Sequence, residues 1–145
     1  MSDLRTEHAA REAESWARFA AALDRIPRDR WDGSEVLPGW TVKDLLWHMA
    51  WWLDKCARNL EHLRTGTGEA AWPAETVDEV NAKLVAEAEG KTVDAVYEEL
   101  LASRRLVRTR WEALPDVDAK AVEEVAGETY EHYDEHLPDL ERFAG

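Results

Sequence analysis

Apolar residues recur every three or four positions along most of the chain, and this spacing is typical of amphipathic α-helices. Residues that end helices, mainly proline and glycine, separate the stretches that show it. We expect helices over residues 3–26, 41–65, 76–90 and 92–114, and a last one from about Asp118 to the C-terminus. Four of these are long and one is short. They predict an all-α four-helix bundle with a short extra helix in the central connection.

Capping signals mark the starts of three of these helices. Thr41 supplies an N-cap hydroxyl and Asp44 an acid three residues later, which is a variant of the capping box. Thr76 and Glu79 form a fuller box, and Thr92 is the expected N-cap of the next helix. The helix starts are therefore predicted more firmly than the helix ends.

Two stretches and one proline interrupt the helical pattern. Residues 28–40 and 66–75 are rich in turn formers and helix breakers, so we expect them to be loops. Pro138 lies inside the last expected helix and has no backbone N–H to donate. We expect it to kink the helix or to restart it.

Composition limits the class of protein. At 145 residues the chain can build a core without disulfides, and its length predicts a single domain over residues 1–145. The formal net charge of −13 argues against nucleic acid or an anionic membrane as a partner. The chain has one cysteine, no signal-peptide pattern at the N-terminus, and no apolar run longer than residues 45–53. We therefore expect a soluble, cytoplasmic protein.

His132 and His136 lie four residues apart in the last expected helix, so both imidazoles can reach one point in space. They share a face with apolar residues and are therefore expected to point towards the core. The other members of this face are Val122, Val125, Ala126, Thr129, Tyr133, Leu140 and Phe143.

An inward pair of imidazoles needs a further ligand to hold a metal, and His48 is the best candidate because it flanks the apolar stripe of the second helix. Three imidazoles and a water form an open, catalytic type of zinc site, and nickel or iron(II) accepts the same nitrogens. The alternative is that each histidine is a core residue hydrogen-bonded to a neighbour. We expect His8 and His62 to be surface or loop residues.

Four further residues have two possible roles. Glu128 and Asp44 lie one turn before His132 and His48 and are candidates to hold a ring N–H of a ligand, although Asp44 is more simply explained as a helix cap. Tyr133 lines either the pocket or the core. Cys56 is expected to be a small core residue rather than a nucleophile.

Trp47, Trp51 and Trp52 cannot all face the core, because neighbouring residues of a helix point about 100° apart. Their outer face forms a dimer interface or a wall of a substrate pocket, or it is covered by the loops that contain Trp31 and Trp72. We favour the interface, because tryptophan is enriched at such surfaces.

Residues 39–50 (Gly-Trp-Thr-Val-Lys-Asp-Leu-Leu-Trp-His-Met-Ala) resemble the Gly-Trp-Thr-Val-x-Asp-Leu-x-x-His-Leu-x signature of the DinB superfamily. This superfamily includes the N-terminal domain of mycothiol-dependent maleylpyruvate isomerase. Residues 128–136 and, less specifically, residues 77–82 are similar to its later segments. The resemblance spans nearly the whole chain.

The resemblance implies an up-down-down-up four-helix bundle, often a homodimer, with one divalent metal at one end of the core. Its ligands fall on His48, His132 and His136. In the maleylpyruvate isomerase branch one of the last-helix ligands is a glutamate, where this chain has a second histidine. This difference places the chain nearer to the three-histidine members.

The superfamily is associated with transferases that use low-molecular-weight bacterial thiols. We therefore expect a metal-dependent thiol S-transferase that acts on a small electrophile. A hydrolase that uses metal-bound water and a metal-free binding module are the alternatives.

Overall fold

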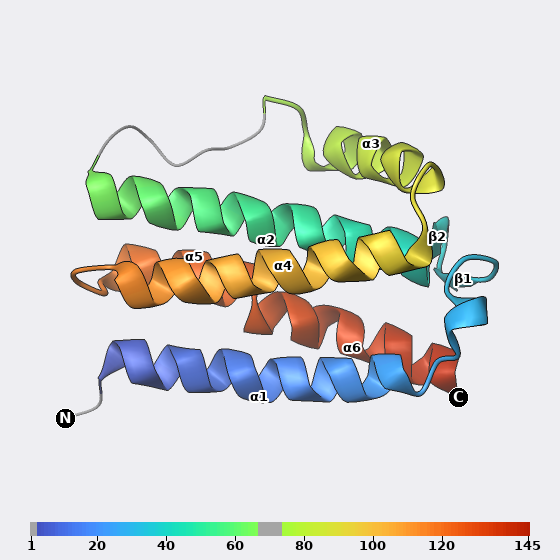
Figure 1. The fold of residues 1–145 in the computed structure, drawn as a ribbon, viewed down its shortest axis with the longest axis horizontal. Helices are drawn as coiled ribbons and strands as arrows, with labels where there is room; N and C mark the ends of the chain where they lie inside the picture. Colours follow the sequence, from blue (N-terminus) through green and yellow to red (C-terminus); the bar gives the residue numbers. More distant parts are fainter. Residues whose placement is uncertain (1–2, 67–73) are drawn as a thin grey trace.

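The computed structural model describes residues 3–66 and 74–145, and it is almost entirely helical. Figure 1 shows its elements in order along the chain. They are α1 (Leu4–Asp24), the 3-10 helix η1 (Arg28–Arg30), β1 (Glu35–Leu37), β2 (Trp40–Thr41), α2 (Val42–Thr65), α3 (Val77–Glu89), α4 (Val93–Ala113), α5 (Ala119–Glu128) and α6 (Tyr130–Ala144). The all-α class is confirmed.

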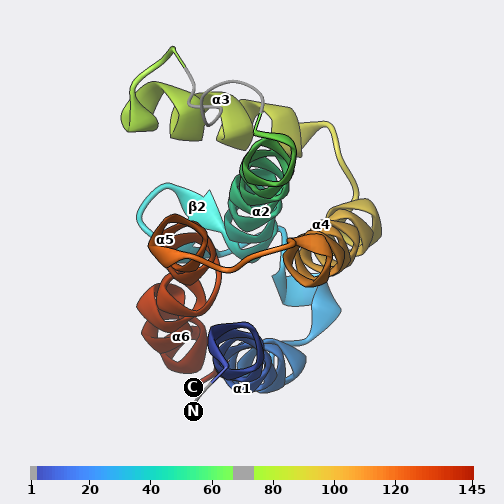
Figure 2. The same ribbon diagram turned by 90° about the vertical axis from the view of Figure 1, so that its left-hand side faces the viewer.

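The bundle has the expected up-down-down-up order. In Figure 1, α1 and the α5–α6 pair run in one direction, whereas α2 and α4 run in the other. Seen end-on in Figure 2, α1, α2, α4 and the α5–α6 pair occupy the four corners. The short helix α3 lies outside the bundle, against the outer side of α2 (Figure 2). It is the extra helix predicted in the central connection.

Side-chain caps explain where the helices begin. A side-chain oxygen at each N-cap accepts a backbone N–H of the first turn, which would otherwise lack a partner. At Thr41 both halves of the capping box are present, because the Asp44 carboxylate also accepts the Thr41 N–H at 3.0 Å. The cap interpretation of Asp44 is therefore confirmed. The N-caps with such bonds are Asp3, Thr41, Thr76, Thr92 and Asp118.

The stretch 28–40 is not simply a loop, and the prediction was incomplete here. It contains η1 and most of a small hairpin, in which β1 pairs with β2 in an antiparallel arrangement. The stretch ends at Trp40, the first residue of β2. Gly39 has a φ of 84°, which glycine adopts without the strain of a side chain and which the tight turn requires. Most of the expected second loop, residues 67–73, lies outside the described residues and includes Trp72.

The last helix is interrupted at Thr129 and is not restarted at Pro138, contrary to expectation. Thr129 has φ −112° and ψ −99°, and it separates α5 from α6. Its buried hydroxyl donates to the Val125 carbonyl at 2.6 Å. Pro138 lies within α6 without ending it. The break places His132 and His136 in the first two turns of α6.

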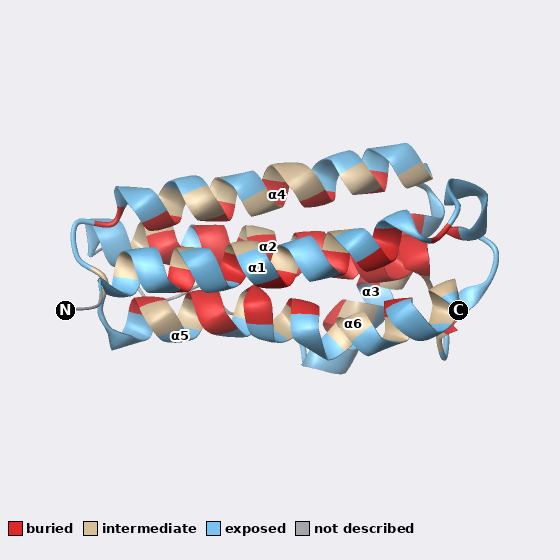
Figure 3. Cartoon of the chain, turned by 90° about the horizontal axis from the view of Figure 1, so that it is seen from below, coloured by how far each residue is buried: buried red, intermediate tan, exposed pale blue. Residues whose placement is uncertain are grey.

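Figure 3 shows the buried residues lining the inner faces of the helices along the length of the bundle. Among the described residues, four charged side chains are also buried: Glu12, Lys43, Asp44 and Lys55. Glu12 of α1 accepts hydrogen bonds from Arg104 at 2.8 and 2.9 Å and from Arg108 at 2.6 Å, both on α4. Tyr133 of α6 donates its hydroxyl to the same carboxylate at 2.9 Å. Arg104, which lies among the apolar residues of α4, is thus a partner of this buried acid.

The tryptophans of α2 are covered largely by α3. Trp52 is buried and packs with Val80 and Leu84 of that helix. The Trp47 indole N–H donates to Glu87 of α3 at 3.1 Å. Trp31, one of the expected covers, instead packs edge-on against Tyr97 of α4. A homodimer built on this face stays a prediction.

Within residues 3–66 and 74–145, no helix combines the length and the apolar character needed to cross a membrane.

Candidate metal centre

Three histidines from two helices meet in the half of the bundle nearer to the hairpin. His48 comes from the second turn of α2, and His132 and His136 come from α6. The Nε2 atoms of His48 and His132 lie 3.1 Å apart. One ligand-type nitrogen from each of the three rings lies within 4.8 Å of the other two. The predicted convergence of these side chains is therefore present.

Burial keeps at least two of these imidazoles neutral. Desolvation, with the nearby His136, lowers the pKa of His48 from 6.5 to about 4. Desolvation and the two other histidines lower the pKa of His132 to about 3. A neutral imidazole has a lone pair available for a metal, whereas an imidazolium has none. At neutral pH these rings are in the form that ligates.

Two polar residues hold the outer nitrogens of the rings. Asn81 of α3 places its side-chain oxygen 3.0 Å from Nδ1 of His48. Asp139, one turn after His136, lies 3.4 Å from the Nδ1 of that histidine. Such partners fix the orientation and tautomer of ligating histidines. The sequence analysis missed both residues, although Asn81 lies inside the segment 77–82 that carries the weaker resemblance.

The donor set fits a divalent metal. Because the Asn81 oxygen can only accept, His48 carries its proton on Nδ1 and presents the Nε2 lone pair towards His132. In a tetrahedral zinc site with bonds of about 2.1 Å, two ligating nitrogens lie about 3.4 Å apart. The observed 3.1 Å between the two Nε2 atoms is close to that value. One ring nitrogen of His136 lies within 4.8 Å of both other ligand nitrogens.

The histidines open into a pocket of about 340 Å³, which is large enough for a small organic molecule. Its lining combines apolar side chains with acids from α5 and α6. Trp40 contributes to the apolar part of the lining, with its ring centroid 4.7 Å from that of His48. The full lining consists of Leu37, Trp40, His48, Trp52, Val77, Asn81, Gly127, Glu128, His132, Glu135 and His136.

Glu128 is the acid with the most unusual environment. Desolvation by burial raises the pKa of Glu128 from 4.5 to about 7, although the nearby Lys55 opposes the rise. Its Oε2 atom is buried and has no hydrogen-bond partner among the described residues. A carboxyl group that titrates near neutral pH can both take up and release a proton there. The sequence analysis named Glu128 as a partner of a ligand ring, but no such bond is present among the described residues.

The other histidines differ from expectation. His8 is not a surface residue, because it is only 6% exposed and its Nδ1 lies 2.9 Å from the Tyr130 hydroxyl. Its partner is 122 positions away, so no local pattern could reveal it. His62 is half-buried on α2 and does not lie in a loop.

Tyr133 and Cys56 are core residues. Tyr133 is fully buried, and burial together with the neighbouring Glu12 raises its pKa well above the usual value. Cys56 is also fully buried, its thiol lies 3.8 Å from the Glu124 carbonyl, and burial raises its pKa. A thiol with a raised pKa is a poor nucleophile near neutral pH. The structural interpretation of Cys56 is therefore supported.

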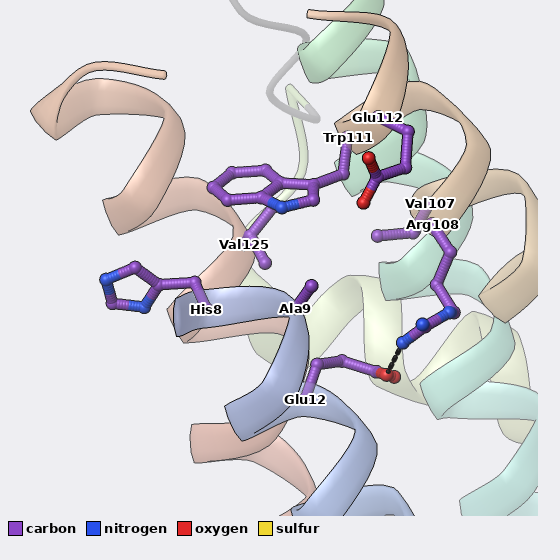
Figure 4. Close-up of a pocket in the computed structure, with 8 residues that line it drawn as sticks. All are labelled: His8, Ala9, Glu12, Val107, Arg108, Trp111, Glu112 and Val125. Atoms are coloured by element: carbon purple, nitrogen blue, oxygen red, sulfur yellow. Dashed lines mark hydrogen bonds and ion pairs between the residues drawn. The ribbon is translucent and has the colours of Figure 1, made fainter. Parts of the chain in front are cut away.

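A second cavity, drawn in Figure 4, lies between α1, α4 and α5. Its volume of about 40 Å³ suits one ordered water rather than a substrate. In Figure 4 the Glu12 carboxylate meets Arg108 at its edge. Because its acid is already paired, this cavity is a feature of the core and not a second site.

Together the fold and the three histidines define a DinB-type four-helix bundle. A family model for the mycothiol maleylpyruvate isomerase N-terminal domain matches residues 12–129. The chain therefore belongs to that family, as its resemblance predicted.

A solved structure supports the fold independently. The crystal structure of the mycothiol-dependent maleylpyruvate isomerase is similar to this chain, with a TM-score of 0.77 and 16% sequence identity. The match covers 97% of this chain but only 63% of that protein. No curated protein matches the chain.

Proposed function

We propose that this chain is a metal-dependent enzyme that uses a small thiol to act on a small electrophile, most simply as an S-transferase. The convergence of His48, His132 and His136 at the base of an open pocket carries this proposal. Membership of a family named for mycothiol, a thiol, supports the choice of cofactor.

The three histidines would hold one divalent metal, with zinc as the first candidate and nickel or iron as the others. All three metals accept neutral imidazole nitrogens. When bound, such a metal lowers the pKa of a coordinated thiol and presents the thiolate to an electrophile.

The chain's own residues have separate tasks in this proposal. Asn81 keeps the His48 ring in the tautomer that ligates. Glu128 accepts the proton that the thiol releases, because its carboxyl lines the pocket and its pKa of about 7 suits proton transfer at neutral pH. Trp40 and Trp52 form an apolar wall that packs the organic part of the ligand and excludes water.

The fate of the thiol separates transfer from isomerisation. In an S-transfer the new carbon–sulfur bond persists in the product, whereas in a thiol-dependent isomerisation the thiol is released unchanged. Mass spectrometry of the product distinguishes the two. Either outcome keeps the metal site and the role of Glu128.

Cobalt substitution tests the thiol step. Addition of a small thiol to the cobalt-loaded protein should produce a thiolate-to-cobalt charge-transfer band in the near ultraviolet. The band should be lost in His132→Ala, while the exposed α1 variant Glu14→Gln keeps it. Absence of the band in cobalt-loaded wild-type protein would contradict thiol use.

One observation also favours a second candidate, a metal-dependent hydrolase. Glu128 could accept a proton from water as well as from a thiol, since its Oε2 is buried without a partner among the described residues. Ester or amide hydrolysis by the metal-loaded protein, with no cobalt–thiolate band, would identify this activity. A protein that binds no metal would instead be a binding module built on the same bundle.

A further inference from the structure

We infer that the histidine pocket takes uncharged or cationic small molecules and discriminates against those that carry a carboxylate. This inference names the ligand class of the site in the proposed function and rests on that function. It follows from the charges around the pocket and from the apolar side chains of its lining.

Both ionisable side chains of the lining, apart from the histidines, are acids. Glu128 lies at the end of α5 and Glu135 in the second turn of α6. Among the described residues no lysine or arginine lines the pocket. Residues 67–73, which lie outside the described part of the chain, include no lysine or arginine.

Two cations on the helices that line the pocket are paired with acids outside its lining. Lys55 of α2 is buried beside Glu124, with its Nζ 3.5 Å from the carboxylate. Arg142 of α6 donates to Asp139 at 2.7 Å. A ligand carboxylate entering the pocket would thus meet two acids and no available cationic partner among the lining residues.

The positive charge of a bound metal alone would attract anionic ligands. The negative charges of Glu128 and Glu135 counteract this attraction. Two carboxylates beside a divalent ion with three neutral imidazoles leave a site with little net charge. The chain as a whole carries a formal charge of −13, which adds a repulsive long-range field for anionic ligands. Glu128 and Glu135 therefore both act as selectivity residues. Glu128 has this role in addition to accepting a proton.

The rest of the ligand is expected to be apolar or aromatic. Leu37, Trp40, Trp52 and Val77 form the apolar side of the pocket. The His48 ring lies close to both indoles, with centroid distances of 4.7 Å to Trp40 and 6.2 Å to Trp52. A flat uncharged group on this wall would keep its reactive end near the histidines.

The first test uses two thiols of nearly equal size, 3-mercapto-1-propanol and 3-mercaptopropionate, titrated into cobalt-loaded protein at low salt. We expect the alcohol to bind about tenfold more tightly, judged by the charge-transfer band. Glu128→Gln and Glu135→Gln should each reduce this ratio at least about threefold. Glu14→Gln, which removes one charge from an exposed site on α1, should leave the ratio unchanged. Comparing ratios between variants cancels the intrinsic difference between the thiols.

A second measurement needs neither metal nor thiol and separates this inference from the proposed function. Ligand-observed NMR of the purified protein with benzyl alcohol and benzoate should show the alcohol binding more strongly, with saturation transfer lost in Trp40→Ala. If thiols give no cobalt band but the alcohol is still preferred, the proposed function fails and the selectivity stands. Equal or stronger binding of the carboxylate in either pair, or no binding of either aromatic compound, would overturn the inference.

Discussion

His48 Nε2 and His132 Nε2 lie 3.1 Å apart, although 84 positions separate the two residues in the chain. The Nδ1 of His48 is committed to Asn81, so its Nε2 presents a lone pair to the other ring. Two such nitrogens are stable at this distance when a proton or a metal lies between them. Their lowered pKa values keep both rings neutral near pH 7, so in the metal-free protein the N–H of a neutral His132 can join them, and both Nε2 lone pairs become available to a metal when that proton lies on Nδ1 of His132.

The contact between Asn81 and His48 is expected to strengthen metal binding. Asn81→Ala should weaken zinc affinity about 10- to 100-fold, because partners of ligating histidines have effects of this size. Competition with a fluorescent zinc chelator measures the change. Lys83→Ala, at an exposed position of the same helix, is the matched control. Equal affinities for the two variants would show that Asn81 does not orient the ligand.

Acid should destabilise the metal-free protein through the buried histidines. The folded-state pKa values of His48 and His132, about 4 and about 3, lie below the unfolded value of 6.5. The unfolded state therefore binds more protons as the pH falls below 6.5. Each histidine then lowers the free energy of unfolding by up to about 1.4 kcal/mol per pH unit until its folded pKa is reached.

Urea denaturation of EDTA-treated protein between pH 7.5 and 4.5 measures this loss. Because carboxylates also titrate in this range, the relevant quantity is the difference from His132→Gln. We expect the variant to have the shallower pH dependence. Parallel curves for the two proteins would refute the assigned pKa shifts.

We expect Glu128 to lower the free energy of unfolding of the protein although it is needed for the proposed reaction. Its folded pKa of about 7 exceeds the ordinary 4.5, so the folded state keeps a proton that the unfolded state releases. The associated loss of stability grows from pH 4.5 to about 7 and is complete above that. Glu128→Gln should therefore raise the free energy of unfolding of metal-free protein by about 1–2 kcal/mol at pH 8, allowing for its partial exposure.

The same variant should lose activity with the thiol, because glutamine cannot accept the proton. A gain in stability with a loss of activity is the expected sign of a functional residue. Denaturation at pH 8 and pH 4.5 tests the first part, and the gain should vanish at the lower pH. Glu14→Gln controls for the general effect of removing one negative charge. An unchanged or lower stability at pH 8 would contradict the account of Glu128.

Glu12 should be important for stability rather than for chemistry. Glu12→Gln removes the charge that pairs with Arg104 and Arg108 and weakens the bond from Tyr133. We expect a loss of about 2–3 kcal/mol, below the range for fully buried pairs because both arginines can reach solvent. Urea denaturation measures it against Glu14→Gln. A change under about 0.5 kcal/mol, within the range of surface substitutions, would contradict the role.

Sequence patterns within one or two helical turns predicted the helices and the pairing of His132 with His136. The capping residues Thr41 and Thr76 act within one turn, so the sequence alone located these helix starts. The four-residue spacing of His132 and His136 likewise predicted that their rings share a face. Features confined to one or two helical turns are visible in a sequence because their partners are nearby.

Other features depend on how distant elements pack. Asn81 reaches His48 only because α3 lies on α2, and His8 is buried only because Tyr130 approaches it from the last helix. The break at Thr129 follows no proline and no residue with positive φ, and Gly127, two residues earlier, was not interpreted as a helix breaker. Glu12 of α1 likewise pairs with Arg104 and Arg108, which are more than 90 positions away on α4.

The central claim is that His48, His132 and His136 hold one divalent metal, and elemental analysis of untagged protein supplemented with zinc tests it most directly. We predict one equivalent of metal per chain and none in a His132→Ala, His136→Ala double variant that keeps its helical circular dichroism. Less than about a tenth of an equivalent in the wild-type protein, or equal metal content in the double variant, would contradict the account.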